Sequence, residues 1–359
     1  MNEPIFIARQ DTLEQEILPA HWLAQYKLFG EESYTFQNKE IWKKLCMSSA
    51  AANDRDMHAE ALEEMLTTFS AEHTGKWMLL VYGMDAAALE GLATMAAIAA
   101  NGTAMGAIAG NALLMHAIAN SETAMQRIAN SQTAMQRVAN NRGAMDAIGR
   151  SRIARDAVQA SPYYNSYIKE NDMAIAKMVV GFANLESAGY SGMAGVAADA
   201  TAMTAVAASS TAMTAVAASG VALKAIAQAY KNTANMLQFL KAVNASDTLI
   251  KRIYSTLTNA TALFGATQLG GQDSVADANK WATTSAAPNA FLACACGYYN
   301  SGGASVDVTY NGTVIAQNKT GTKQPGSVTS TNVNAITMAP STFTENGDGW
   351  LAVQKFTAK

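Results

Sequence analysis

The chain has 359 residues and a net charge of −3, and 15% of its residues are charged, against about 25% in ordinary soluble proteins. So small a net charge argues against electrostatic capture of nucleic acid, and it also argues against intrinsic disorder. At roughly 150 residues per domain, the length predicts two or three domains.

Residues that carry out chemistry are few. Three cysteines (Cys46, Cys294 and Cys296) supply neither a disulfide framework nor four zinc ligands. His58 and Glu60 have the H-x-E spacing of zinc deaminases, but no P-C-x-x-C motif follows, so we interpret this segment as a solvated helix face. Nucleotide-binding glycine motifs and a nucleophile elbow are missing. We therefore expect no enzyme activity, no cofactor and no metal.

Residues 1–80 read as a helical head or attachment piece. The segment 22–29 holds an apolar cluster. Farther along, Ala61, Leu62 and Met65 recur at helical spacing, and Glu63 is expected on the opposite, solvated side. The first residues have neither a basic nor an apolar stretch of useful length, so no signal peptide is expected.

The middle of the chain is a decapeptide repeat, with units such as SETAMQRIAN and SQTAMQRVAN. When the decapeptides are aligned in columns, one position is Met and the position three residues later is Ile or Val. The same pair of positions recurs in a second group of decapeptides farther along the chain, in a shifted register. Residues three and four apart share a helix face, so we expect these columns to form a buried core. The expected core residues are Met105, Ile108, Met115, Ile118, Met125, Ile128, Met135, Val138, Met203, Val206, Met213 and Val216.

Ten residues do not fit a straight helix, because at about 100° per residue the apolar face shifts by about 80° per unit. Each junction has an Asn that tolerates the left-handed conformation, followed by a capping Ser or Asn, as at Asn120–Ser121 and Asn130–Ser131. We therefore predict one very short helix and a tight turn per unit, stacked as an α-solenoid-like array. A β-solenoid and an unbroken helical bundle remain open as alternatives.

The repeats divide the middle zone into a first array at 81–160, an irregular insertion or bend at 161–190, and a second array with following helices at 191–266. The uncharged stretches 91–121 and 200–223 are long enough to span a membrane. Both are rich in small and turn-forming residues, so we expect no membrane insertion.

From residue 267 to 359, β-forming residues and turns predict an antiparallel β-sandwich. Alternating residues flank Asn311–Gly312, which is typical of a hairpin with a type I′ turn. Further strands are expected at 290–299, 327–338 and 350–356. The fold class is thus multidomain α plus β. Four aromatic residues are candidates for surface recognition: Tyr298, Tyr299, Tyr310 and Trp350.

Two other features of the sequence favour ordinary structural roles. Arginines cluster late in the first array, from Arg127 to Arg155, where a solvated or subunit-contacting face is favoured over a nucleic-acid stripe. His116 stands in a column otherwise filled by Gln126 and Gln136, and so is expected to be exposed.

The runs SETAMQRIANSQTAMQRVAN and TAMTAVAASSTAMTAVAAS, within residues 91–228, resemble the Ala/Ser/Thr/Met decapeptide arrays of bacteriophage tail-fibre and other virion-appendage proteins. The resemblance implies a structural protein of a tailed-phage virion, assembled in the host cytoplasm. Its expected partners are other virion proteins, further copies in a homo-oligomer, and a host cell-surface glycan or protein.

In this hypothesis the N-terminal region attaches, the repeats act as a spacer, and the β region contacts the host surface or a neighbouring protein. Two alternatives are a bacterial or prophage adhesin-like module, and a collar, whisker or baseplate component without receptor binding.

Overall fold

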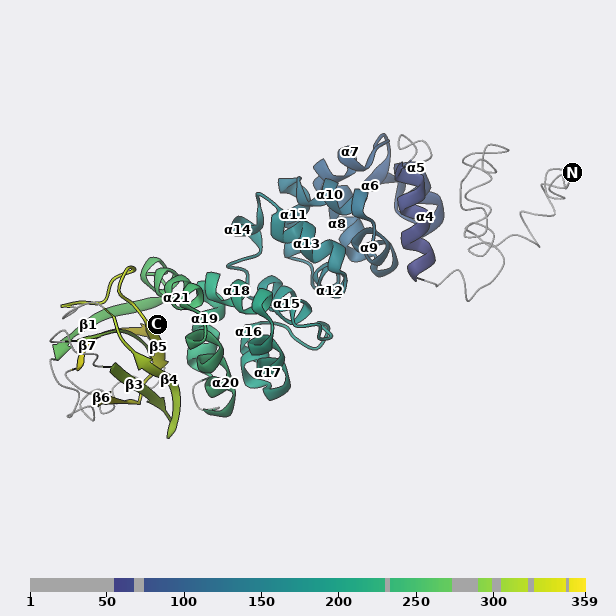
Figure 1. Ribbon diagram of the computed structural model, residues 1–359. Coiled ribbons are helices and arrows are strands. Elements are labelled where there is room, and N and C mark those ends of the chain that lie inside the picture. The colour runs from purple at the N-terminus through teal and green to yellow at the C-terminus, as the bar shows by residue number, and fades with distance from the viewer. Residues whose placement is uncertain are drawn as a thin grey trace, which may run out of the picture. The chain divides into compact units, whose positions relative to one another are not determined.

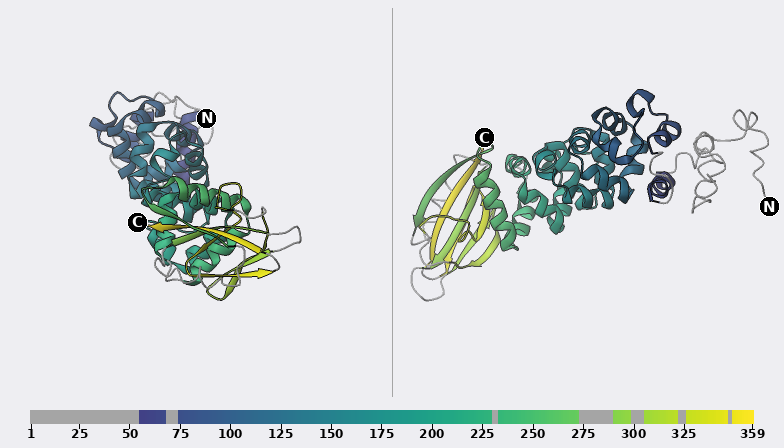
Figure 2. Two further views of the ribbon diagram at one scale, coloured as in Figure 1. Left: turned by 90° about the vertical axis from the view of Figure 1, so that its left-hand side faces the viewer. Right: turned by 90° about the horizontal axis from the view of Figure 1, so that it is seen from above.

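The computed structural model describes residues 55–67, 74–229, 233–272, 290–298, 305–321, 326–346 and 349–359 (Figures 1 and 2). The apolar cluster expected at 22–29 lies outside them. Described residues up to Ile168 belong to one compact unit, and those from Lys169 onward belong to a second. The structure thus divides the chain inside the segment expected to be an insertion.

In the first unit, each decapeptide forms its own short helix, so a β-solenoid and an unbroken helix are both wrong. The helix of each decapeptide is followed by a residue with extended or bridge-region backbone before the next helix begins. The helices are α4 Arg55–Thr67, α5 Thr74–Tyr82, α6 Ala86–Leu89, α7 Met95–Ala100, α8 Gly102–Gly110, α9 Ala112–Ala119, α10 Glu122–Ala129, α11 Gln132–Ala139, α12 Arg142–Arg150, α13 Arg152–Ala160 and α14 Tyr164–Tyr167.

The helices from α7 to α10 each pack on the third helix after them: α7 on α10, α8 on α11, α9 on α12 and α10 on α13. Consecutive helices are sharply bent, by 103° between α8 and α9. Three decapeptides therefore complete one turn of about thirty residues, and the apolar face of each helix is turned inward. All twelve residues expected to form the repeat core are buried.

The junctions depend on side-chain caps. Ser131 accepts a hydrogen bond from the N–H of Ala134, and Asn141 does the same for Ala144. The expected left-handed Asn at the preceding helix end is wrong, because Asn130 has φ −90° and ψ 4°. Its amide instead donates to the carbonyl of Gln126, which satisfies an acceptor at the helix end.

The second unit repeats this arrangement, with α15 packed on α18, α16 on α19, α17 on α20 and α18 on α21. The expected irregular segment 161–190 contains a regular helix, α15, capped by Asn171 and buried at Ile175 and Met178. The helices are α15 Asp172–Phe182, α16 Met193–Ala198, α17 Ala200–Ala208, α18 Ser210–Ala218, α19 Gly220–Gln228, α20 Thr233–Asn244 and α21 Asp247–Asn259.

The C-terminal strands form two antiparallel sheets of order β1-β7-β2-β5 and β4-β3-β6. The predicted hairpin is confirmed, with positive φ at both Asn311 (47°) and Gly312 (75°). Of the expected strand 327–338 only Ala335–Met338 forms a strand, and the strands at Phe264–Gln272 and Ser341–Asn346 were not expected. The strands are β1 Phe264–Gln272, β2 Ala290–Tyr298, β3 Ser305–Tyr310, β4 Thr313–Lys319, β5 Ala335–Met338, β6 Ser341–Asn346 and β7 Gly349–Ala358.

The first sheet is covered on both faces. On one face, Phe291 and Phe356 contact Phe239 of α20 and Tyr254 of α21. On the other face, β3 of the second sheet contacts β2, β5 and β7. Because α20 and α21 also pack on α17 and α18, the strands share one compact unit with the second array rather than standing apart from residue 267.

Among the described residues, no single helix is long and apolar enough to cross a membrane. Two bent pairs pass the same test only when joined: α8 with α9, and α17 with α18. They lie in the uncharged stretches noted in the sequence.

Candidate functional site

The structure does not bring together the three candidate aromatic residues that it describes. Tyr298 pairs with Gly349, whereas Trp350 pairs with Gly297, so the two rings point to opposite faces of the first sheet. Both are partly exposed. Tyr310 belongs to the second sheet and is only 4% exposed, so it is no surface residue. Burial raises the pKa of the Tyr310 hydroxyl. The fourth candidate, Tyr299, lies outside the described residues.

The two thiols of β2 are packed as small core residues. Cys294 and Cys296 point to the same face of the first sheet, and both are fully buried. Burial raises the pKa of Cys296 to about 12 and also raises that of Cys294. Both thiols are therefore protonated at neutral pH, which makes them poor nucleophiles and poor metal ligands.

The arginines of the first array do not form one stripe. Arg127 lies on α10, Arg137 on α11 and Arg142 on α12, and each of these helices stacks in a different column of the thirty-residue turn. Arg155 stands in the Met column and is 8% exposed, and its Nη1 donates to the carbonyl of Gly149 at 2.7 Å. Neighbours in the sequence are thus directed to different sides of the array.

The described histidines are not solvated. His58 is fully buried, and its Nδ1 lies 3.0 Å from the Tyr82 hydroxyl, so the prediction of a solvated face is wrong at this position. The side chain of His116 is 17% exposed rather than exposed, with Nε2 3.8 Å from the Asp56 carboxylate and 3.1 Å from Asn120 Nδ2. Burial lowers the pKa of His116. No group of three potential metal ligands occurs among the described residues.

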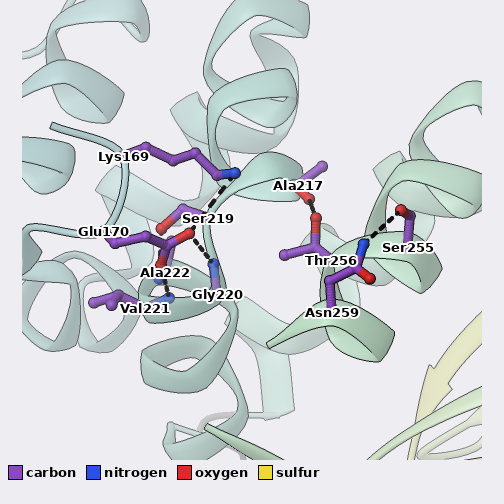
Figure 3. Close-up of polar contacts among 10 residues, drawn as sticks. All are labelled: Lys169, Glu170, Ala217, Ser219, Gly220, Val221, Ala222, Ser255, Thr256 and Asn259. Carbon is purple, nitrogen blue, oxygen red and sulfur yellow. Dashed lines mark hydrogen bonds and ion pairs between the residues drawn. The ribbon is translucent and has the colours of Figure 1, made fainter. Parts of the chain in front are cut away.

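Carboxylates cap two array helices from a distance. Glu63 of α4, expected to be solvated, accepts hydrogen bonds at the start of α10 from the Ser121 hydroxyl and from the N–H and hydroxyl of Thr123. Glu170 does the same for α19, where it accepts from the N–H groups of Gly220 and Val221 (Figure 3). Negative charge at a helix N-terminus is favourable, which explains both positions.

These two glutamates were missed because their partners lie 58 and 50 residues away in the chain. The only local signal is that each precedes an array by a few tens of residues. Nothing in the decapeptide pattern distinguishes them from ordinary surface glutamates.

Pockets open on the described surface include one in each compact unit. One, of about 430 Å³, lies between α10 and α13 and is lined by charged, amide and small apolar side chains that include Glu122, Arg152 and Asp156. The other, of about 290 Å³, lies between α21 and the turn segment 327–334. Both pockets therefore offer hydrogen-bonding groups to a ligand.

No protein-family model matches the chain, and no curated protein matches it at a significant level.

Proposed function

We propose that this chain is a non-enzymatic structural protein of a tailed-bacteriophage virion, a tail fibre or similar appendage. The proposal rests on one observation above all: helix after helix packs on the third helix along, with a buried Met followed three residues later by a buried Ile or Val, and with Ser, Asn or Asp as the usual cap. Such an array can be lengthened by adding decapeptides, because each added helix extends the existing hydrophobic core. This property suits a spacer.

In this proposal each of the two arrays is an α-solenoid, and the two sheets form a β-sandwich that follows the second array in the chain. Bonds between turns stiffen the spacer, as where Ser131 donates to the carbonyl of Ala99 at 2.6 Å. The N-terminal region attaches to other virion proteins. The β region contacts the host surface or a neighbouring subunit, with many copies giving avidity.

Purified particles test this proposal directly. Mass spectrometry should find the chain in phage particles banded by density, and immunogold labelling should place it on an appendage. Detection only in the bacterial envelope, with none in particles, would favour the adhesin-like alternative. Tail and capsid genes on both sides of the coding sequence would agree with the virion role.

A further inference from the structure

The smaller pocket, between α21 and the segment 327–334, has a lining of one chemical kind. Besides Tyr254 and Val328, its lining consists of hydroxyl and amide side chains: Ser255, Thr258, Asn259, Thr329 and Ser330. None of the residues that line it carries a formal charge. Its volume of about 290 Å³ is just below the ~300–1,000 Å³ of pockets for drug-sized ligands, so it has room for one small unit of a larger ligand.

The pocket is held in shape on its helix side. Thr256 of α21 donates to the carbonyl of Ala217 at 2.8 Å, which fastens α21 to α18 (Figure 3). On the neighbouring turn of α21, the amide of Asn259 donates to the Ser255 hydroxyl at 3.3 Å. The two polar groups of the rim therefore orient each other before any ligand arrives.

The opposite wall is a turn closed by its own hydrogen bonds. Asn332 accepts from the N–H of Thr329 at 2.7 Å and donates to the carbonyl of Ser327 at 2.8 Å. The Tyr254 hydroxyl lies 2.9 Å from the carbonyl of Val328, which ties the turn to α21. A preformed pocket loses little conformational entropy on binding, so weak polar contacts suffice.

We propose that this pocket binds one neutral sugar residue of a glycan. The inference rests on the proposed function only for the source of that glycan, a host surface. Hydroxyl and amide groups both donate and accept, which matches the alternating donors and acceptors of a sugar. Thr258, for example, donates to the carbonyl of Tyr254 at 2.8 Å and keeps its lone pairs for a ligand hydroxyl. An anionic ligand would meet no cation in this lining.

Binding of the full-length protein to an array of neutral and anionic glycans tests the inference. We expect binding to neutral glycans, weakened about three- to tenfold in Thr258→Val, as for one lost hydrogen bond. Ser330→Trp should abolish it by filling the pocket. The matched control is Thr204→Val, because Thr204 is also exposed and makes the same 2.8 Å bond to the carbonyl four residues earlier.

Three results would overturn the inference: no neutral glycan bound, equal weakening by Thr204→Val and Thr258→Val, or pocket variants that impair only the binding of a host protein. Thermal unfolding of each variant checks that it is folded. If the Ser330→Trp variant does not fold, the binding of the Thr258→Val variant alone decides the test. Failure here is separate from failure of the virion role, because detection of the chain in particles does not depend on any ligand.

Discussion

The hydroxyl of Ser151 donates a 2.6 Å hydrogen bond to the carbonyl of Ala119, which lies 32 residues earlier in the chain. The same hydroxyl accepts from the N–H of Ala154 and so caps its own helix. Ser131 with Ala99 and Ser161 with Ala129 repeat the relationship at the same separation. Ser151 thus caps the N-terminus of one helix and also donates a hydrogen bond to the last carbonyl of a helix about one thirty-residue turn earlier in the chain.

Replacing Ser151 by Ala removes both bonds and leaves a buried carbonyl without its donor. We expect a loss of about 1–3 kcal/mol in the free energy of unfolding, measured by urea denaturation. Ser210→Ala is the control: Ser210 is exposed at the first position of α18, and its loss should change stability by less than about 0.5 kcal/mol. Equal effects of the two changes would contradict the dual role of Ser151.

The Met column gives a second prediction. Met125 is fully buried, so Met125→Asp places an unpaired charge in the core and should unfold several stacked helices together. Gln126→Asp, one residue later on the exposed side, should change stability little. Circular dichroism of the two variants should show a large loss of helix signal in the first only. A β-type spectrum for the parent protein would overturn the helical assignment.

Substitution of glycine by alanine should have opposite effects on stability at Gly220 and at Gly106. At Gly220 a Cβ would stand 3.0 Å from both Ala260 Cβ and Leu263 Cδ1, so Gly220→Ala should destabilise by about 1–3 kcal/mol. At Gly106, inside α8, a Cβ would meet nothing within 4 Å, and Gly106→Ala should stabilise by about 0.5–1 kcal/mol. Thermal unfolding measures both changes. A gain of stability at Gly220 would show that α19 does not approach the end of α21 as closely as described.

The sequence predicts one short helix per decapeptide and the stacking of these helices, but not which helix packs on which. The short helix and its caps follow from local side-chain chemistry, as does the Asn311–Gly312 turn, whose two positive φ angles suit those residues. The thirty-residue turn depends on contacts between residues about thirty positions apart in the chain, such as the hydrogen bond between Ser151 and Ala119, which no local pattern encodes. The docking of the first sheet on α20 and α21 was missed for the same reason, since Phe291 and Phe239 are far apart in sequence.

The partly buried His116 predicts a pH dependence. Burial lowers its pKa in the folded state, so the unfolded chain binds the proton first as the pH falls below about 6.5. Stability should therefore fall between pH 7 and pH 5, with no contribution from this residue at higher pH. His116→Gln introduces the residue that occupies the same position in neighbouring decapeptides, as at Gln126 and Gln136. This variant should lose less stability between pH 7 and pH 5. Unfolding curves at both pH values measure the difference, and identical pH profiles of parent and variant would contradict the prediction.

The distance between spin labels at residues 126 and 156 tests the thirty-residue turn most directly. Both positions are exposed, one on α10 and one on α13, and the labels require Gln126→Cys and Asp156→Cys with Cys46→Ser. Stacked helices lie about 8–10 Å apart, so we predict strong dipolar coupling between the labels. An unbroken helix would place the two positions about 45 Å apart at about 1.5 Å per residue, and a distance of that order would contradict the stacked array.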